Sequence, residues 1–289
     1  MSTSQVSTPS VPIHSGHVEL EHGRVYFETC GPDVGPPVVL VHGIASGGFV
    51  WDRNFTALSE IGRTVLRFDL YGRSRSAKPQ IRYDLDLYCE QIRQLLEALG
   101  IQGAVDVVGL SMGGAVSVGF ADRYPDMVRK LALIAPAGAP GTDPWIVRLL
   151  KREGWGEVLY KLIGARALIL GARRSFRDPA EFESFFERLR AQFSEPGYLD
   201  AILSSLRFMP IHSLADAYQR VGRHERDSLL IWGDRDQIIP YPAHVFVRRW
   251  MPNLHFEPLE GAGHACNLED SDFVNALLVR FLGEGADPA

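Results

Sequence analysis

The feature that most constrains this 289-residue chain is a serine in a glycine-rich turn between a predicted strand and a predicted helix. Residues 104–108 read Ala-Val-Asp-Val-Val, a β-branched run typical of a buried parallel strand. The turn Gly-Leu-Ser-Met-Gly follows at 109–113, and residues 114–121 are small and apolar, as in a helix packed closely on a sheet. So sharp a turn needs small residues two positions either side of the serine, and it exposes the hydroxyl. Ser111 is therefore a candidate nucleophile, although G-x-S-x-G alone also fits an ordinary glycine-rich turn.

Strand-like and helix-like segments alternate through the first half of the chain. Apolar runs at 38–41, 64–70 and 128–134 have the length and composition of buried strands. Residues 83–99 carry apolar side chains at helical spacing and are followed by Gly100, a C-cap residue. This alternation predicts an α/β fold with a mostly parallel sheet and helices on both faces. In such a sheet the chemistry lies at the carboxyl ends of the strands.

The alternation stops at residues 135–141, which read Ala-Pro-Ala-Gly-Ala-Pro-Gly. Only helix-like segments follow until about Arg223, and a strand pattern resumes at 229–232. We interpret this interruption as a helical cap laid over the strand ends. The predicted organisation is a disordered leader at 1–16, an α/β core at 17–137 and 224–284, a helical cap at 138–223 and a tail at 285–289.

Composition narrows the class of protein. An apolar content of 46% supports a large core, and a net charge of −5 gives no reason to expect a nucleic-acid partner. No apolar run approaches the roughly 18 residues of a membrane span, so stable membrane insertion is not expected. The N-terminus lacks the basic and apolar regions of a secretory signal. Three widely spaced cysteines (Cys30, Cys89, Cys266) fit a reducing compartment, so we expect a cytoplasmic protein; the oligomeric state is not indicated.

Two later loops supply the partners that a nucleophilic serine needs. Asp236 follows the apolar run at 229–232, within Gly-Asp-Arg-Asp. His264 ends the glycine-rich sequence Gly-Ala-Gly-His. Acyl transfer requires a base to take the serine proton and a carboxylate to orient that base, which are the roles we predict for His264 and Asp236.

With Ser, Asp and His in this order, the sequence resembles the α/β-hydrolase family, in particular its lidded carboxylesterases and monoacylglycerol-lipase-like members. The match covers roughly 38–281, apart from the cap. The resemblance implies an eight-stranded, mostly parallel sheet and a reaction without a metal or organic cofactor. It also implies that Ser111 attacks, that His264 acts as base and then as acid, and that Asp236 orients His264. The backbone N–H groups of Ile44 and Met112 would form the oxyanion hole.

Several other residues near these motifs have competing interpretations. Asp234 is the alternative acid, but in the family pattern the first Asp more often bonds the loop backbone. We expect His42 to brace the oxyanion loop, Asp69 to brace its own turn and Cys266 to be a buried filler. Ser74 stands where many relatives have glycine, which leaves the conformation of that loop undetermined.

The residues next to these motifs distinguish this chain from some other classes within the family that it resembles. Dehalogenases and epoxide hydrolases need an aspartate nucleophile. Carbon–carbon bond hydrolases usually carry Asn before the serine and Trp after the histidine, where this chain has Leu110 and Ala265. We predict a serine esterase whose partner is a small-molecule ester. A carbon–carbon hydrolase, a lactonase, an amidase, perhydrolase side activity and a non-catalytic small-molecule receptor stay open as alternatives.

The cap gives a hint about the substrate. Its segments are unusually apolar for an insertion, which predicts an apolar pocket and a preference for short- to medium-chain or aryl esters. Trp145, Leu149 and Phe186 are the candidate substrate-binding residues. The cap also carries basic residues interleaved with acids, which we interpret as a solvated helix face, with weak attraction to an anionic lipid surface as the alternative: Arg148, Lys151, Arg152, Lys161, Arg166, Arg173, Arg174 and Arg177.

Overall fold

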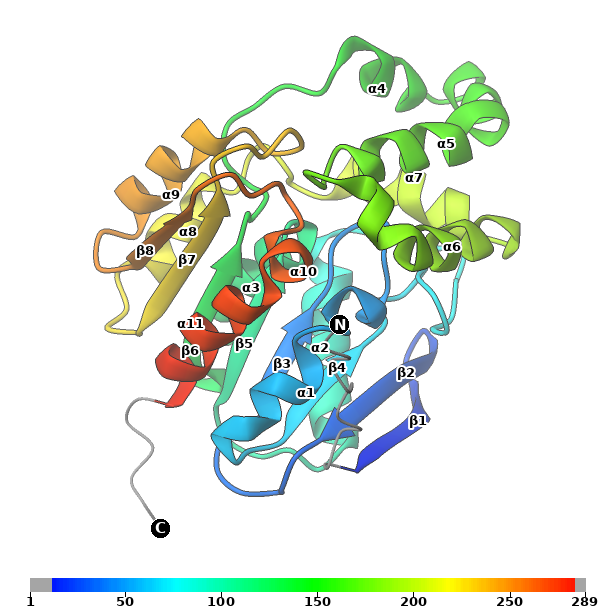
Figure 1. The fold of residues 1–289 in the computed structure, drawn as a ribbon. Coiled ribbons are helices and arrows are strands. Elements are labelled where there is room, and N and C mark those ends of the chain that lie inside the picture. Colours follow the sequence, from blue (N-terminus) through cyan, green and yellow to red (C-terminus); the bar gives the residue numbers. More distant parts are fainter. Residues whose placement is uncertain (1–11, 284–289) are drawn as a thin grey trace, which may run out of the picture.

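The computed structural model describes residues 12–283 and contains an eight-stranded sheet, as predicted (Figure 1). Its strand order is β1-β2-β4-β3-β5-β6-β7-β8. The pairs β1/β2 and β2/β4 are antiparallel and every other neighbouring pair is parallel. The strands are β1 Ile13–Leu20, β2 Gly23–Cys30, β3 Val38–Val41, β4 Val65–Phe68, β5 Val105–Leu110, β6 Val128–Ile134, β7 Ser228–Gly233 and β8 His255–Leu259.

The first strand corrects one predicted boundary. β1 begins at Ile13, inside the range 1–16 that we predicted as a disordered leader. It pairs along its whole length with β2, from Ile13 opposite Cys30 to Leu20 opposite Gly23. Backbone hydrogen bonds to a neighbouring strand order these residues whatever their side chains are. Composition does not reveal such pairing. Residues 1–11 and the predicted tail at 285–289 lie outside the described part of the chain.

Helices cover both faces of the sheet because its central strands are apolar on both sides. All residues of β3, β4, β5 and β7 are buried. One face packs against α2 Leu85–Ala98, α3 Met112–Arg123, α8 Ala215–Val221 and α9 His244–Trp250. The other face packs against α1 Phe55–Leu58, α10 Cys266–Glu269 and α11 Ser271–Gly283 (Figure 1). The described residues also form short 3-10 turns: η1 Gly48–Trp51, η2 Ser59–Ile61, η3 Pro125–Met127, η4 Pro179–Phe182, η5 Gln192–Ser194 and η6 Tyr241–Ala243.

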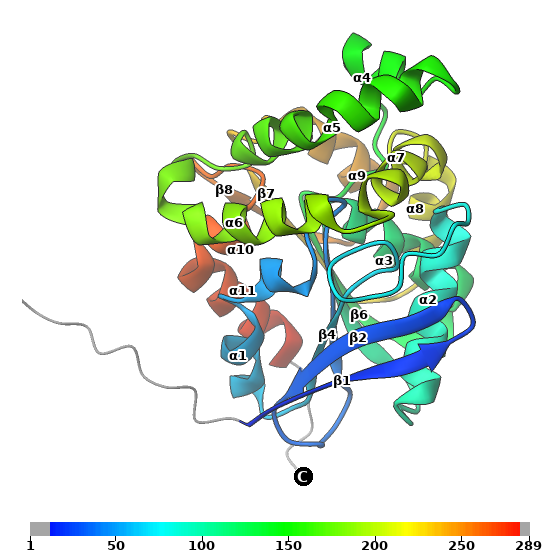
Figure 2. The same cartoon turned by 90° about the vertical axis from the view of Figure 1, so that its right-hand side faces the viewer.

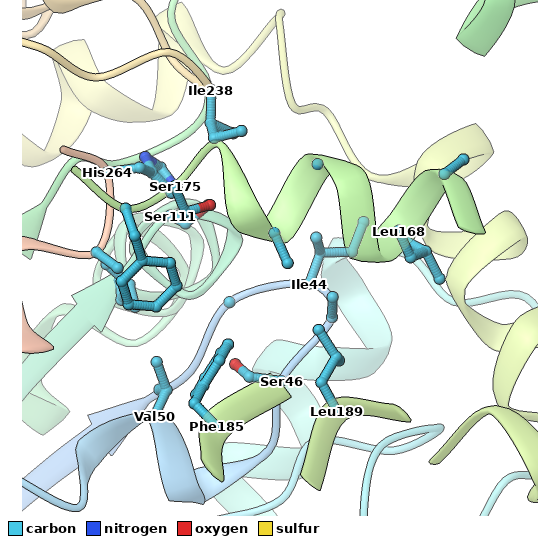
Figure 3. Close-up of a pocket in the computed structure, with 18 residues that line it drawn as sticks. Ile44, Ser46, Val50, Ser111, Leu168, Ser175, Phe185, Leu189, Ile238 and His264 are labelled. Carbon is cyan, nitrogen blue, oxygen red and sulfur yellow. The ribbon is translucent and has the colours of Figure 1, made fainter. Parts of the chain in front are cut away.

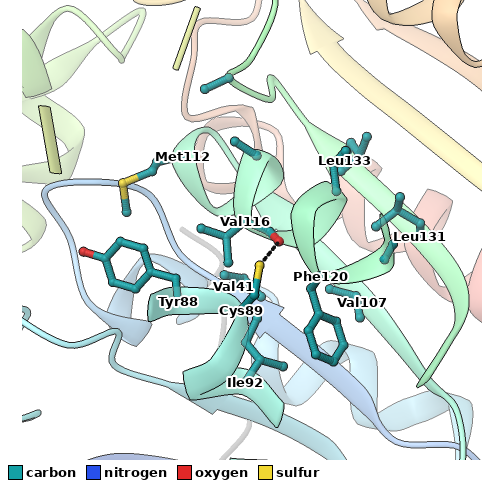
Figure 4. Packing of buried hydrophobic residues seen from close by; sticks show 14 of the residues in the cluster. Val41, Tyr88, Cys89, Ile92, Val107, Met112, Val116, Phe120, Leu131 and Leu133 are labelled. Atoms are coloured by element: carbon teal, nitrogen blue, oxygen red, sulfur yellow. Dashed lines mark hydrogen bonds between the residues drawn. The ribbon is translucent and has the colours of Figure 1, made fainter. Parts of the chain in front are cut away.

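Helices α2 and α3 pack closely, and a Cβ added at Gly119 of α3 would lie 2.6 Å from the Leu85 side chain of α2. Cys89 and Ile92 of α2 lie against Val116 and Phe120 of α3, all fully buried (Figure 4). The Cys89 thiol donates to the Val116 carbonyl at 3.8 Å. This packing fixes α3, and with it the turn that carries Ser111 at the N-terminal end of α3.

Four helices lie over the carboxyl ends of the strands, and we call them the cap (Figures 1 and 2). They are α4 Trp145–Leu150, α5 Trp155–Arg173, α6 Glu183–Ala191 and α7 Tyr198–Phe208. The predicted range of 138–223 was too long, because α8 packs on α3 in the core. Tyr218 of α8 is buried there, and its hydroxyl donates to the Ala137 carbonyl at 2.7 Å.

Candidate active site

The three predicted catalytic residues follow strands whose carboxyl ends meet at one edge of the sheet. Ser111 directly follows β5, Asp236 lies three residues after β7, and His264 lies five residues after β8. Because β5, β6, β7 and β8 are parallel in this order, the three loops emerge on the same side. The fold therefore brings together residues that are far apart in the sequence.

Ser111 has a backbone conformation that non-glycine residues rarely adopt, with φ 58° and ψ −120°. Two flanking glycines make the turn possible. A Cβ at Gly109 would lie 2.5 Å from the Gly113 carbonyl oxygen, and a Cβ at Gly113 would lie 2.2 Å from that of Val41. The strand and the helix thus approach too closely for any side chain at these positions, which is the physical reason for the G-x-S-x-G pattern.

His264 and Asp236 are joined by a buried hydrogen bond. His264 Nδ1 lies 2.7 Å from Asp236 Oδ2, and both residues are buried. An ionised carboxylate only accepts, so Nδ1 carries the proton and Nε2 keeps its lone pair. The other carboxylate oxygen accepts the backbone N–H groups of Ile238 and Ile239 at 2.8 and 2.9 Å. The carboxylate is therefore held in one orientation, and it holds the imidazole in one tautomer.

The alternative acid has a different role. Asp234 is exposed, and its Oδ1 accepts the backbone N–H of Gly261 at 2.7 Å. This bond ties the loop after β7 to the loop after β8. The prediction that Asp234 bonds the loop backbone, and that Asp236 faces the histidine, agrees with this geometry.

His42 braces the loop after β3, as predicted. Its Nδ1 donates to the Gly43 carbonyl at 2.7 Å, and its Nε2 accepts the Leu70 N–H at 2.8 Å. Complete burial lowers the pKa of His42 to about 3, so the ring is neutral, as this donor and acceptor pair requires. Asp69 braces the neighbouring turn by accepting the Gly48 N–H at 2.7 Å. His42 is therefore committed to holding structure.

Ile44, one of the two predicted oxyanion donors, lies in the loop after β3. Side chains from other segments hold this loop by hydrogen bonds to its carbonyl groups. Its carbonyl accepts Arg73 Nε at 2.5 Å, and the next carbonyl, of Ala45, accepts the Tyr198 hydroxyl at 2.6 Å. Arg73 is fully buried and also donates to Ser205 of α7 at 2.7 Å. These bonds fix the loop beside Ser111, where Ile44 lines the pocket described below. Met112, the other predicted donor, is the first residue of α3, where backbone N–H groups have no partner within the helix.

Ser74 adopts a left-handed backbone conformation, which glycine adopts without strain. Its φ is 42°, and its backbone N–H donates to the Gln192 side chain of the cap at 2.7 Å. A cap contact therefore holds this loop in a strained, glycine-like form.

A cavity of about 210 Å³ adjoins the candidate nucleophile, and Figure 3 shows Ser111 and His264 at the same end of it. Its core side includes Ile44, Ser46 and Val50. Apart from His264, no titratable side chain lines this cavity within the described part of the chain. The cap contributes Ala167, Leu168, Gly171, Ala172, Ser175, Phe176, Phe185 and Leu189.

None of the three predicted substrate-binding residues lines this cavity. Trp145 and Leu149 of α4 are exposed. Phe186 is fully buried, 5.4 Å from the ring of Phe176, while its neighbour Phe185 lines the cavity. Apolar composition predicted an apolar pocket under the cap, but the rotation of each helix decides which residues face the cavity.

The comparisons with known proteins agree with this architecture. Residues 36–271 match the family model described as alpha/beta hydrolase fold. This chain belongs to the α/β-hydrolase family. Its predicted fold class is thereby confirmed.

Relatives of this α/β hydrolase have diverse activities. A putative non-heme chloroperoxidase of Synechocystis sp. is 27% identical, over 89% of this chain and 94% of that protein. A 2-hydroxy-6-oxononadienedioate/2-hydroxy-6-oxononatrienedioate hydrolase of Dechloromonas aromatica is 27% identical, over 97% of this chain and 96% of that protein. The structure of an enol-lactonase from Burkholderia xenovorans LB400 is similar with a TM-score of 0.78, at 21% identity over 93% of this chain and all of that one. Membership of the family therefore leaves the substrate undetermined.

In this α/β hydrolase the cap is bonded to the loop that carries His264. The Ser175 carbonyl accepts the Ala265 N–H at 2.9 Å. Glu269 of α10 bridges the two segments, because one carboxylate oxygen accepts the Gly263 N–H at 2.8 Å and the other accepts the Arg177 N–H. Sequence reasoning did not identify Glu269 or Arg73, since neither lies in a motif and only the tertiary structure shows their contacts.

Proposed function

We propose that this α/β hydrolase cleaves uncharged carboxylic esters with short- to medium-chain or aryl groups, through an acyl-enzyme on Ser111. The observation that carries the proposal is the apolar cavity beside Ser111 and His264, whose lining offers no charged partner for an ionised substrate. Its volume of about 210 Å³ is below the range of about 300 to 1,000 Å³ typical of sites for drug-sized ligands, which favours small acyl groups.

In the proposed reaction His264 Nε2 takes the Ser111 proton as Oγ bonds to the ester carbonyl carbon. The Ile44 and Met112 N–H groups hold the resulting oxyanion, each contributing roughly 3 to 4 kcal/mol. Protonated His264 then gives its proton to the leaving alcohol, and the acyl group stays on Oγ. Water attacks the acyl-enzyme with His264 again as base, releasing the carboxylic acid and restoring Ser111. Asp236 stabilises the imidazolium in both steps.

Two relatives define the alternatives. A dienedioate substrate, as named for the Dechloromonas protein, carries two carboxylates, for which this cavity offers no cationic side chain. A lactone is a cyclic ester, and its hydrolysis requires the same steps as that of an open-chain ester. Lactone hydrolysis is therefore the second candidate function, and the structural similarity to an enol-lactonase supports this candidate.

Steady-state and burst kinetics with p-nitrophenyl esters of increasing chain length test the proposal. We expect the highest kcat/KM on acetate to hexanoate esters, and little turnover of a p-nitrophenyl ester with a charged acyl group such as hemisuccinate. A fluorophosphonate probe should label Ser111, and Ser111→Ala should abolish both turnover and labelling while the midpoint of thermal unfolding stays near that of the wild type.

Two results would contradict the proposal. Turnover that persists in Ser111→Ala would remove the assigned nucleophile. Rapid labelling of Ser111 without ester or lactone turnover would leave an activated serine whose substrate is of another class, and would favour a carbon–carbon hydrolase or a receptor.

A further inference from the structure

The outer face of the cap carries large apolar side chains that the protein does not cover. Trp155 and Leu162 of α5 are 89% and 74% exposed, and Trp145 of α4 is 69% exposed. Three further apolar residues of these helices are exposed: Leu149, Val158 and Leu170. Both views show α4 and α5 at the top of the molecule, beyond the other cap helices (Figures 1 and 2). An apolar patch of this kind marks an interaction surface.

Helix α5 has an apolar outer face and an apolar inner face. Trp155, Val158 and Leu162 are three and four residues apart, so they lie on one side of the helix. On the other side Tyr160 is buried and Gly171 lines the cavity. A surface helix normally carries mostly polar residues on the side opposite its buried face, whereas α5 exposes Trp155, Val158 and Leu162 there. The outer side therefore needs a partner that the rest of the described chain does not provide.

The same surface is positively charged. Residues 145–174 contain seven Lys or Arg and two Glu, in a chain whose net charge is −5. One of the two acids, Glu157, is paired with Arg207 of α7 at 2.7 Å. Lys151, Lys161 and Arg173 are in turn paired with Asp143, Asp200 and Glu183. Four further cations are exposed around the apolar patch: Arg148, Arg152, Arg166 and Arg174.

The positive charge and the apolar side chains of this surface together indicate which kind of partner could cover it. A second copy of the chain would bring two positively charged faces together, which is unfavourable. An anionic lipid surface complements both properties, because tryptophan and leucine enter the headgroup region while Lys and Arg contact phosphates. We propose that the α4–α5 surface docks this protein on anionic lipid membranes.

The helix lies on the surface in this arrangement and does not cross it. No helix between residues 12 and 283 is long and apolar enough to span a bilayer. Since the inner side of α5 lines the cavity, docking places the cavity about one helix diameter, ~10 Å, from the lipid. The docking surface does not depend on which reaction occurs at Ser111.

Vesicle co-sedimentation with the full-length protein tests the proposal. Phosphatidylcholine vesicles are compared with vesicles that contain 30% phosphatidylglycerol, at low and high sodium chloride. We expect at least tenfold stronger partitioning onto the anionic vesicles, weakened several-fold by high salt. Trp155→Ser/Leu162→Ser should weaken binding about tenfold or more, and Lys161→Gln/Arg166→Gln should lower the preference for anionic lipid several-fold. The matched control is Phe273→Ser, which removes an apolar side chain of α11 that is 54% exposed.

Hydrolysis of p-nitrophenyl butyrate without vesicles is measured for every variant. The docking variants should keep wild-type turnover, because none of their residues lines the cavity. Equal binding to neutral and anionic vesicles, or equal weakening by Phe273→Ser, would overturn the docking proposal alone. A dimer without lipid that Trp155→Ser/Leu162→Ser dissociates would show that a second copy covers the face, and would overturn it too. Vesicle binding without ester turnover would instead contradict only the proposed function.

Discussion

Replacing Asp236 with asparagine has a consequence that the hydrogen bonds around it determine. Oδ1 accepts two backbone N–H groups, those of Ile238 and Ile239, and these donors cannot rotate away. The asparagine oxygen must therefore stay on that side, which turns its NH₂ group toward His264 Nδ1. Since an NH₂ group only donates, Nδ1 must accept and the ring proton moves to Nε2. In that tautomer His264 cannot take the Ser111 proton.

We expect kcat of Asp236→Asn to fall about 10⁴-fold, equivalent to about 5 kcal/mol in the activation free energy. The assay is steady-state hydrolysis of p-nitrophenyl butyrate, with thermal unfolding measured on the same samples. KM should change little, because Asp236 does not line the cavity.

Asp234→Asn is the matched control for this substitution. Asparagine keeps the oxygen that accepts the Gly261 N–H, so kcat should stay within a few-fold of the wild type. The reasoning would be refuted if Asp236→Asn kept more than about a tenth of the wild-type kcat. It would also be refuted if Asp234→Asn lost as much activity as Asp236→Asn.

Three further predictions concern the core. Gly113→Ala should inactivate the protein and lower its stability by about 3 kcal/mol in urea unfolding, because the new Cβ would lie 2.2 Å from the Val41 carbonyl oxygen. Burial lowers the pKa of His42 to about 3 from 6.5, so below pH 6.5 the unfolded chain binds the proton that the native state excludes. The free energy of unfolding should therefore fall as the pH decreases from 6.5 toward 3, by up to about 5 kcal/mol from this residue. In His42→Gln the free energy of unfolding should depend less on pH over this range. A difference in unfolding free energy between the two proteins that does not change with pH would contradict this. Burial also raises the pKa of the free thiols of Cys30 to about 11 and of Cys89 to about 12. Ellman's reagent at pH 8 should therefore react slowly with the native protein. After denaturation it should react rapidly with all three thiols.

The parts of the site that the sequence predicted are those that local residue types determine. A serine between Gly109 and Gly113 implies the strained turn, because only glycine fits where strand and helix touch. The position of Asp236 just after the predicted strand at 229–232, and of His264 in a glycine-rich loop further along the chain, marked both as candidate partners of Ser111.

Other parts depend on tertiary packing and could not be predicted. Phe185 and Phe186 are adjacent in sequence but differ by about 100° around α6, so only one of them reaches the cavity. Arg73 lies in a loop with no pattern that marks a buried residue, yet it links the Ile44 carbonyl to Ser205 of the cap. Helix α8 looked like another cap helix because its sequence does not show that it packs on α3.

The bonds between the cap and the histidine loop limit how this protein can diversify. Exchange of a whole cap between relatives would vary the acyl pocket in one step, but here the segment at 175–177 is bonded to the residues around His264. A foreign cap that lacked these bonds would change the position of the His264 loop as well as the shape of the pocket. The Glu269 side chain and the backbone path of residues 175–177 should therefore be kept together, and a chimera that keeps both native would preserve the base while the rest of the cap is replaced.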